Sequence, residues 1–144
     1  NGERQIIDGQ QRITSLCLLL RAVFSMLEKE DNKTDEVNNF IQKIKPALWK
    51  ENEMTGKEDR SKILLRSEVV TDSGNLILRN ILESGEADKN AKDNYSKNYR
   101  HFQEMFDKHS TENPLMVYQF IYALLNQAIL LPITADTQDT ASIR

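Results

Sequence analysis

The sequence has a single cysteine, no excess of basic residues and no apolar run long enough to cross a membrane. One thiol cannot form an internal disulfide, so the cysteine content does not indicate an oxidising compartment. The formal net charge of −3 argues against a DNA-binding face, which would need a basic surface. The apolar run at residues 16–20 is far shorter than the roughly 20 residues that span a bilayer. No signal peptide is visible, so we expect a cytoplasmic protein with no membrane partner.

The 144 residues, of which 39% are hydrophobic, are enough for one globular domain and too few for two of ordinary size. Asn1 is not a natural start, and residues 136–144 resemble a capped helix that has barely begun when the sequence stops. We therefore expect residues 1–144 to be a single domain that forms part of a longer protein.

A strand, a turn and a long helix are predicted for residues 4–30. Residues 4–8 alternate weakly and predict a short strand, and Asp8-Gly9 predicts a tight turn after it. From Gln10 to about Lys29, apolar residues recur at helical spacing. The middle of this predicted helix is apolar on nearly all sides, which indicates a central, buried helix. Cys17 lies in this stretch, and we expect it to be a small buried hydrophobic residue.

The region from residue 34 to residue 127 is predicted to be mainly helical. Thr34 or Asp35 can cap a helix that Pro46 closes, and Ser73 can cap a shorter helix with Gly85 past its end. Residues 50–60 are polar and predict a loop, whereas residues 63–70 suggest an extended segment.

The last third of the chain predicts two more helices and a strand. An aromatic stripe at helical spacing from Tyr95 to Phe106 indicates packing rather than base stacking. Asn113-Pro114 is a typical helix start, and the buried face of that helix is predicted to comprise Leu115, Tyr118, Ile121, Tyr122 and Leu125. Residues 128–134 predict a late strand, at a sheet edge or bulged because of Pro132. The expected fold class is α+β and mostly helical, with several helices around one long buried helix and two or three short strands.

The polar residues of the first thirty positions gather at the predicted turn, from Asp8 to Arg12. Asp8 could cap the helix or hold a divalent metal, and Gly9 would let a phosphate approach closely. Gln10 and Gln11 offer uncharged donors and acceptors suited to orienting a water. Arg12 opposes the helix dipole by roughly 0.3–1 kcal/mol unless an anion is bound there. The two readings are an anion site and a capped helix start in which Arg12 bridges to a nearby carboxylate.

The segment Ile7-Asp8-Gly9-Gln10-Gln11-Arg12-Ile13-Thr14-Ser15-Leu16 resembles the signature of the GmrSD-type N-terminal domain family, also called domain-of-unknown-function family 262. Residues 94–102 and 129–143 resemble later parts of that family more loosely. The resemblance implies a fold related to the ParB and sulfiredoxin group. It also implies a role in modification-dependent restriction or another anti-phage system, in which nucleoside triphosphate hydrolysis is coupled to DNA cleavage by a separate nuclease domain.

Carried over by this resemblance, Asp8, Gly9, Gln10, Gln11 and Arg12 become the nucleotide-binding residues. Asp8, Gln11 and Arg12 would be catalytic, with Asp8 holding Mg²⁺ or orienting water and Arg12 clamping phosphate. The family's upstream Tyr-Gln-Arg-x-Tyr-x-Trp region is absent from this sequence, and its downstream Phe-x-x-Leu-Asn motif would lie past Arg144. We therefore expect this segment to hydrolyse little by itself, and to meet DNA only through the rest of its parent protein.

Two other functions stay open on the sequence. The first is a helical interaction or regulatory module without turnover, which is compatible with a homo-oligomer. The second is direct DNA recognition, which the charge balance disfavours. His101 and His109 have no cysteine or carboxylate at metal-ligand spacing, so we assign them no role.

Overall fold

The computed structural model describes the backbone of residues 2–64 and 72–128, and the side chains of residues 12–64 and 76–126. The elements in chain order are α1 (Gly2–Glu28), α2 (Asp35–Leu48), β1 (Trp49–Glu51), β2 (Glu58–Ile63), α3 (Asp72–Ser84), α4 (Asn94–Glu112) and α5 (Pro114–Ala128). The predicted class, α+β and mostly helical, is confirmed. Among the described residues, none of the helices combines the length and apolarity that a bilayer span needs.

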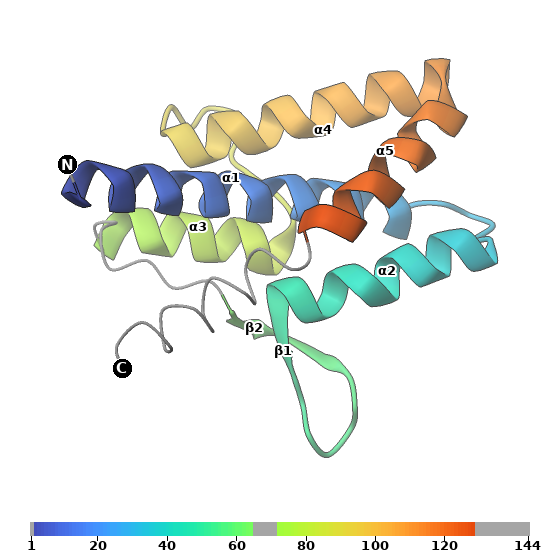
Figure 1. Ribbon diagram of the computed structural model, residues 1–144, viewed down its shortest axis with the longest axis horizontal. Helices are drawn as coiled ribbons and strands as arrows, with labels where there is room; N and C mark the ends of the chain where they lie inside the picture. The colour runs from blue at the N-terminus through green and yellow to red at the C-terminus, as the bar shows by residue number, and fades with distance from the viewer. Residues whose placement is uncertain (1, 65–71, 129–144) are drawn as a thin grey trace.

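The long helix α1 lies at the centre of the molecule, as its nearly continuous apolar run predicts. It contacts α2, α3 and α4, and Figure 1 shows α4 on one side of it with α2 and α3 on the other. Its buried residues include Leu18, Leu20, Val23, Phe24 and Leu27, and they form the middle of the core. Cys17 is 2% exposed, which confirms the prediction that it is buried.

The strand predicted over residues 4–8 is wrong, because α1 begins at Gly2 and continues through Gly9 without a turn. A helix tolerates one interior glycine at a cost of about 1 kcal/mol. A five-residue strand, by contrast, needs a partner strand. In the described part of the chain, β1 and β2 pair only with each other.

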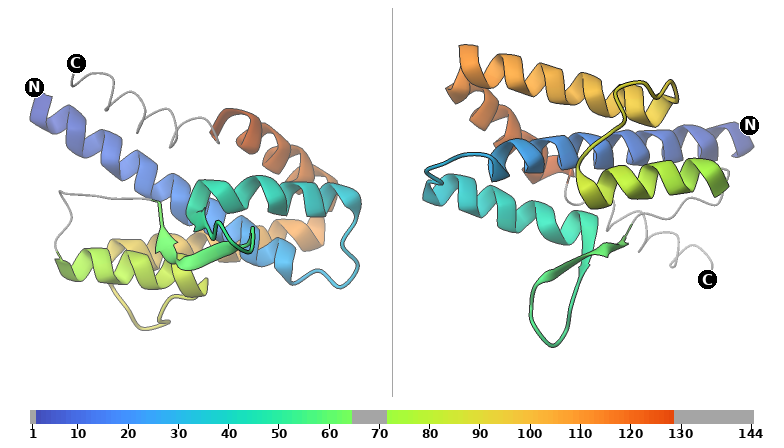
Figure 2. Two further views of the ribbon diagram at one scale, coloured as in Figure 1. Left: turned by 90° about the horizontal axis from the view of Figure 1, so that it is seen from below. Right: turned by 180° about the vertical axis from the view of Figure 1, so that it is seen from behind.

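Residues 49–63 form an antiparallel hairpin where the sequence predicted a polar loop. β1 and β2 pair with Lys50 opposite Asp59 and Glu51 opposite Glu58, and the register shifts between Trp49 and Lys50. Figures 1 and 2 show the hairpin standing out from the helices. The sequence did not indicate this element, because its residues are mostly polar and, apart from buried Trp49, are half-buried or exposed without a regular alternation. Of the extended segment predicted over residues 63–70, residues 65–70 lie outside the described residues.

Most helix ends follow the predicted signals. Thr34 caps α2 through a 3.2 Å hydrogen bond from the amide of Val37, although the helix passes through Pro46 and ends at Leu48. Gly85 follows α3 with a φ of +77°, and Asn113 separates α4 from α5, which begins at Pro114 as expected. α3 begins at Asp72, one residue before the expected cap. The predicted late strand overlaps α5 at residue 128, and residues 129–134 and 136–144 lie outside the described residues.

The aromatic stripe of α4 packs into the core as predicted, with Tyr99 and Phe106 buried. The buried face of α5 differs from the prediction. Ile121 and Leu125 are buried, but Leu115 and Tyr122 are exposed. The helix is apolar on both sides, so its hydrophobic spacing could not identify the inner face.

Candidate functional site

The five motif residues, Asp8 to Arg12, occupy consecutive positions inside α1. The helix begins six residues before Asp8, so the amide groups of these five residues fall where helical N–H groups bond carbonyl oxygens four residues earlier. A helix N-terminus with free amide groups, as predicted for an anion site, is therefore not present in this segment. Positions 11 and 12 follow position 8 by three and four residues, so each of them neighbours position 8 on the surface of the helix.

Arg12 is exposed, and it is the only one of the five motif residues whose side chain the structure describes. No hydrogen bond or ion pair joins it to another residue within the described part of the chain. The alternative in which Arg12 bridges to a nearby carboxylate is thus not observed there. The side chain of Arg12 is exposed, whereas Thr14, two residues later, faces the interior.

Arg21, on the same helix, is buried instead, with 1% of its surface exposed. Its Nε donates a 2.9 Å hydrogen bond to the carbonyl oxygen of Leu82, and its Nη2 lies 3.5 Å from the carbonyl oxygen of Glu83. Both acceptors belong to the last turn of α3, the negative end of the helix dipole. No carboxylate lies within ion-pair distance of Arg21 among the described residues. The C-terminus of α3 therefore takes the place of a counter-ion.

A directed chain of hydrogen bonds leads from Arg21 to Gly85, the residue after α3. Nη1 of Arg21 donates to Oγ of Ser25 at 3.0 Å, and that hydroxyl lies 3.2 Å from the phenolic oxygen of Tyr99. Tyr99 in turn donates to the carbonyl oxygen of Gly85 at 2.6 Å. Since a phenol has only one proton to donate, Ser25 must be the donor to Tyr99. The chain joins α1, α4 and the end of α3.

Two aromatic rings complete the surroundings of Arg21. Its Cζ lies 5.3 Å from the ring centroid of Phe24 and 5.1 Å from that of Trp49, within the range of cation–π attraction. Arg60 lies equally close to both rings, at 5.1 and 5.0 Å. The two rings meet edge to face, with centroids 5.0 Å apart. Two guanidinium groups thus share one aromatic pair.

The electrostatics of this cluster follow from burial. Burial lowers the pKa of Arg21, and the neighbouring Arg60 lowers it further, but an arginine in a protein stays protonated. Burial also raises the pKa of Tyr99, against the opposing effects of Ser25 and Arg21. Arg21, Ser25 and Tyr99 are buried, and no buried side-chain nitrogen or oxygen of the described residues lacks a hydrogen-bond partner, so these residues position α1 and do not form a ligand site. An arginine one turn before Ser25 on an apolar helix was the sequence signal for it.

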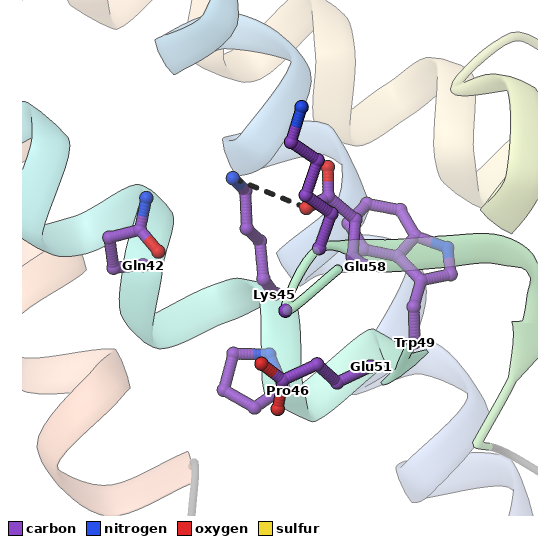
Figure 3. A pocket seen from close by; sticks show the side chains of 8 residues that line it. Gln42, Lys45, Pro46, Trp49, Glu51 and Glu58 are labelled. Atoms are coloured by element: carbon purple, nitrogen blue, oxygen red, sulfur yellow. Dashed lines mark ion pairs between the residues drawn. The ribbon is translucent and has the colours of Figure 1, made fainter. Parts of the chain in front are cut away.

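A groove of about 340 Å³ lies between the end of α2 and the hairpin (Figure 3). Its lining includes Gln42, Lys45, Pro46, Trp49, Glu51 and Glu58. Nζ of Lys45 lies 3.3 Å from Oε2 of Glu58, which Figure 3 shows as a dashed line. Burial alone would raise the pKa of Glu58, but hydrogen bonds from its own backbone amide and from Lys45 outweigh this and lower it. The charges in the groove already neutralise one another, so it offers no concentrated charge to a ligand.

Within the described residues, no three His, Cys, Asp or Glu side chains come together as a metal site. The metal role predicted for Asp8 and the nucleotide roles of Gly9, Gln10 and Gln11 concern side chains outside that description, and they stay predictions.

The comparisons with known proteins agree with the resemblance in the motif. No curated protein matches the chain. No solved structure matches it either, so the relation to the ParB and sulfiredoxin fold also stays a prediction. One family model does match, described as "GmrSD restriction endonuclease, N-terminal domain", and its match extends over residues 1–143. A match over nearly the entire length identifies the chain as a member of the GmrSD restriction endonuclease N-terminal domain family.

Proposed function

We propose that this chain is the nucleotide-binding portion of a nucleoside-triphosphate-hydrolysing domain in a modification-dependent restriction protein that acts against phage. DNA cleavage would belong to a separate nuclease domain of the same system. The observation that carries the proposal is the family match over residues 1–143 in a chain that has Asp-Gly-Gln-Gln-Arg at positions 8–12. The family's restriction-endonuclease description supplies the DNA context.

Arg12 is the motif residue whose described surroundings fit the proposal. Its guanidinium is exposed, and no described carboxylate neutralises it. In this proposal the guanidinium donates charge-assisted hydrogen bonds to a phosphate. Asp8 lies one helical turn before Arg12 on the same side of α1, and Gln11 directly precedes Arg12 in the helix. In this proposal Asp8 holds Mg²⁺ or orients water, Gln11 orients water, and Gly9 and Gln10 complete the nucleotide contacts.

The helical course of α1 changes the expected basis of phosphate binding. Backbone amides within a helix are already bonded, so recognition at positions 8–12 rests on side chains and mainly on the charge of Arg12. A nucleotide bound with Mg²⁺ would supply the reactive phosphate, and the metal ion would neutralise part of the phosphate charge. The chain would position the phosphate and contribute one cation, the guanidinium of Arg12. A site of this kind needs further groups, which agrees with the expectation that the segment alone turns over little substrate.

The test is triphosphate hydrolysis by the whole protein that contains this chain. Arg12→Ala should reduce turnover by about 10²-fold or more, the usual effect of removing one charge-stabilising donor. Arg79→Ala is the matched control, because Arg79 is also an exposed arginine on a helix and lies in α3. Equal turnover in the two variants would exclude the role of Arg12.

One observation favours a second candidate, the helical interaction or regulatory module without turnover. Gly9 lies inside a continuous helix, and so the turn geometry that would bring phosphate close to the backbone is not formed. This candidate predicts that no nucleotide, with or without magnesium, changes the thermal stability of the protein.

A further inference from the structure

The middle of helix α1 is buried on every side. Six consecutive residues, Leu20 to Ser25, are each at most 9% exposed. Six residues extend more than once around a helix of about 3.6 residues per turn, so no side of this stretch faces solvent. Four of the six are apolar, and apolar contacts have no preferred direction. Hydrophobic burial alone therefore distinguishes poorly between one rotation of α1 about its axis and another.

Arg21 and Ser25 are the two polar residues of this stretch, and their hydrogen bonds do have a direction. Nε of Arg21 lies 2.9 Å from the carbonyl oxygen of Leu82, and the hydroxyl oxygen of Ser25 lies 3.2 Å from that of Tyr99. These partners belong to α3 and α4, so the two bonds join α1 to two other helices. A rotation of α1 by one residue position, about 100°, would carry the guanidinium away from its acceptors and leave a buried charge unpaired. Buried polar contacts of this kind fix register between apolar surfaces.

The rotation that is fixed at Arg21 determines the direction of Arg12. Arg12 precedes Arg21 by nine residues, about two and a half turns, and so lies on the opposite side of the helix. Thr14 precedes Arg21 by seven residues, about two full turns, and so lies on the same side. The burial agrees, because Arg21 and Thr14 are 1% and 4% exposed whereas Arg12 is exposed. Since α1 is one continuous helix over these positions, its rotation is the same at both arginines (Figure 1).

We propose that Arg21 is a positioning residue for Arg12. By bonding to the end of α3 it holds α1 in the one rotation that turns Arg12 outward. The orientation of Arg12 is independent of any ligand, whereas its importance for a nucleotide rests on the proposed function. Arg21 contacts no ligand in this role, because it is buried on the opposite side of α1.

The test of orientation is the rate at which a thiol at position 12 or 14 reacts with a maleimide in the full 144-residue chain. A Cys17→Ala background removes the native thiol. With Arg21 in place, Arg12→Cys should react at least about 100-fold faster than Thr14→Cys, because only the first position is exposed. Adding Arg21→Met should slow the reaction at position 12 by about twofold or more and quicken it at position 14 by about tenfold or more, since at least about half of the molecules leave the observed rotation.

Arg60→Met is the matched control. Arg60 contacts the same two rings as Arg21, but its hydrogen bond is to Glu28 in a partly exposed ion pair, so both rates should stay unchanged. Arg21→Gln repeats the test with a smaller loss of stability, because one amide donor remains, and sucrose in the buffer favours the folded form of every variant. Unchanged rates in either folded Arg21 variant overturn the proposal. A faster reaction at position 14 without a slower one at position 12 overturns it too, because local unfolding alone would cause that.

A second measurement links this orientation to the proposed hydrolysis. In the whole protein that contains this chain, Arg21→Gln should lower kcat by about twofold or more, in proportion to the molecules that leave the observed rotation. In an Arg12→Ala background it should lower kcat no further, because it acts only through Arg12. An additional loss in that background overturns the positioning role. A wild-type protein that hydrolyses no triphosphate contradicts the proposed function instead, and the thiol rates still decide the role of Arg21.

Discussion

Nε of Arg21 donates a 2.9 Å hydrogen bond to the carbonyl oxygen of Leu82, sixty-one residues further along the chain. The same oxygen accepts a second hydrogen bond, from Nε1 of Trp49 at 3.1 Å. A single carbonyl at the end of α3 thus ties α1 and β1 to that helix. The arrangement combines a desolvated cation with the negative end of a helix dipole, and it explains why an arginine is buried without a carboxylate beside it.

Replacing Arg21 should therefore be costly. In Arg21→Met the aliphatic part is kept, but three hydrogen bonds are lost and Glu83 and Ser25 lose their donor. We expect a loss of about 2–4 kcal/mol in the free energy of unfolding, measured by urea denaturation. Arg60→Met is the matched control, since Arg60 contacts the same two rings from a partly exposed position and should cost about 1 kcal/mol or less. Equal losses, or a gain for Arg21→Met, would contradict the assignment.

Gly85 should be sensitive for the same reason. Its φ is +77°, and a Cβ added there would lie 2.5 Å from Nη2 of Arg21 and 2.9 Å from Oγ of Ser25. Gly56 has a similar φ of +71°, but its Cβ would meet only Oε1 of Glu51, at 3.6 Å. Gly56→Ala should therefore cost only the backbone conformation, about 1–2 kcal/mol. Gly85→Ala should cost more, because Arg21 must also leave its hydrogen bonds.

A double-mutant cycle identifies the origin of the extra cost at Gly85. In a background of Arg21→Met the clash with the guanidinium is gone, so Gly85→Ala should become milder, although the added Cβ would still lie 2.9 Å from Oγ of Ser25. The coupling between the two sites should then lie in the range of about 0.5–3 kcal/mol that contacting residues show. Additive effects of Gly85→Ala and Arg21→Met would show that the contact with Arg21 contributes nothing to the cost at Gly85.

The sequence predicted the parts of the fold that local chemistry determines. The centre of α1, the cap at Thr34, the end of α3 at Gly85 and the start of α5 at Pro114 all follow from apolar spacing or from residues with special backbone preferences. Elements that depend on distant partners were missed. The hairpin around Trp49 has polar strands whose pairing no periodicity indicates.

The candidate site shows the same division. The identities of Asp8 to Arg12 and the family resemblance could be read from the sequence, and the match over residues 1–143 confirms the family. The backbone conformation of these residues could not be predicted from the sequence, because Asp-Gly is compatible with both a turn and a helix. The partners of Arg21 could not be predicted from the sequence either, since its acceptors at Leu82 and Glu83 lie some sixty residues away.

The cap of α4 gives a prediction about pH. Asp93 accepts a 2.9 Å hydrogen bond from the amide of Ser96. Burial would raise the pKa of Asp93, but hydrogen bonds from Ser96 and from nearby amides outweigh this and lower it. When the pKa of a carboxyl group is lower in the folded chain than in the unfolded chain, the group stabilises the fold. The full effect is present at pH values above the pKa in the unfolded chain, which is about 3.9. This stabilisation is lost as the pH falls through the folded value.

Two substitutions separate capping from charge. Asp93→Ala should lose about 1 kcal/mol at neutral pH, because the amide of Ser96 loses its acceptor. Asp93→Asn should keep most of the stability at neutral pH, since asparagine caps helices about as well as aspartate. Between about pH 5 and about pH 2 it should lose less stability than the wild type, because this is roughly the pH range over which one carboxyl group is protonated. Urea denaturation at several pH values measures both. If Asp93→Asn loses as much stability at acid pH as the wild type does, other carboxylates cause that loss.

Nucleotide binding can be tested separately from turnover through thermal stability. A ligand that binds only the folded chain stabilises it by about 2.7 kcal/mol at about 100 times its Kd. We expect Mg²⁺ with a non-hydrolysable triphosphate to raise the Tm of the 144-residue chain, and Arg12→Ala to remove most of that rise without changing the Tm of the free protein, because Arg12 is exposed. Arg79→Ala should respond like the wild type.

Raising the salt concentration should weaken the rise in Tm, since the contact pairs an exposed guanidinium with an anion. A rise in Tm that is the same in wild type and Arg12→Ala would place the nucleotide elsewhere, whereas no rise in any variant would favour the module without turnover.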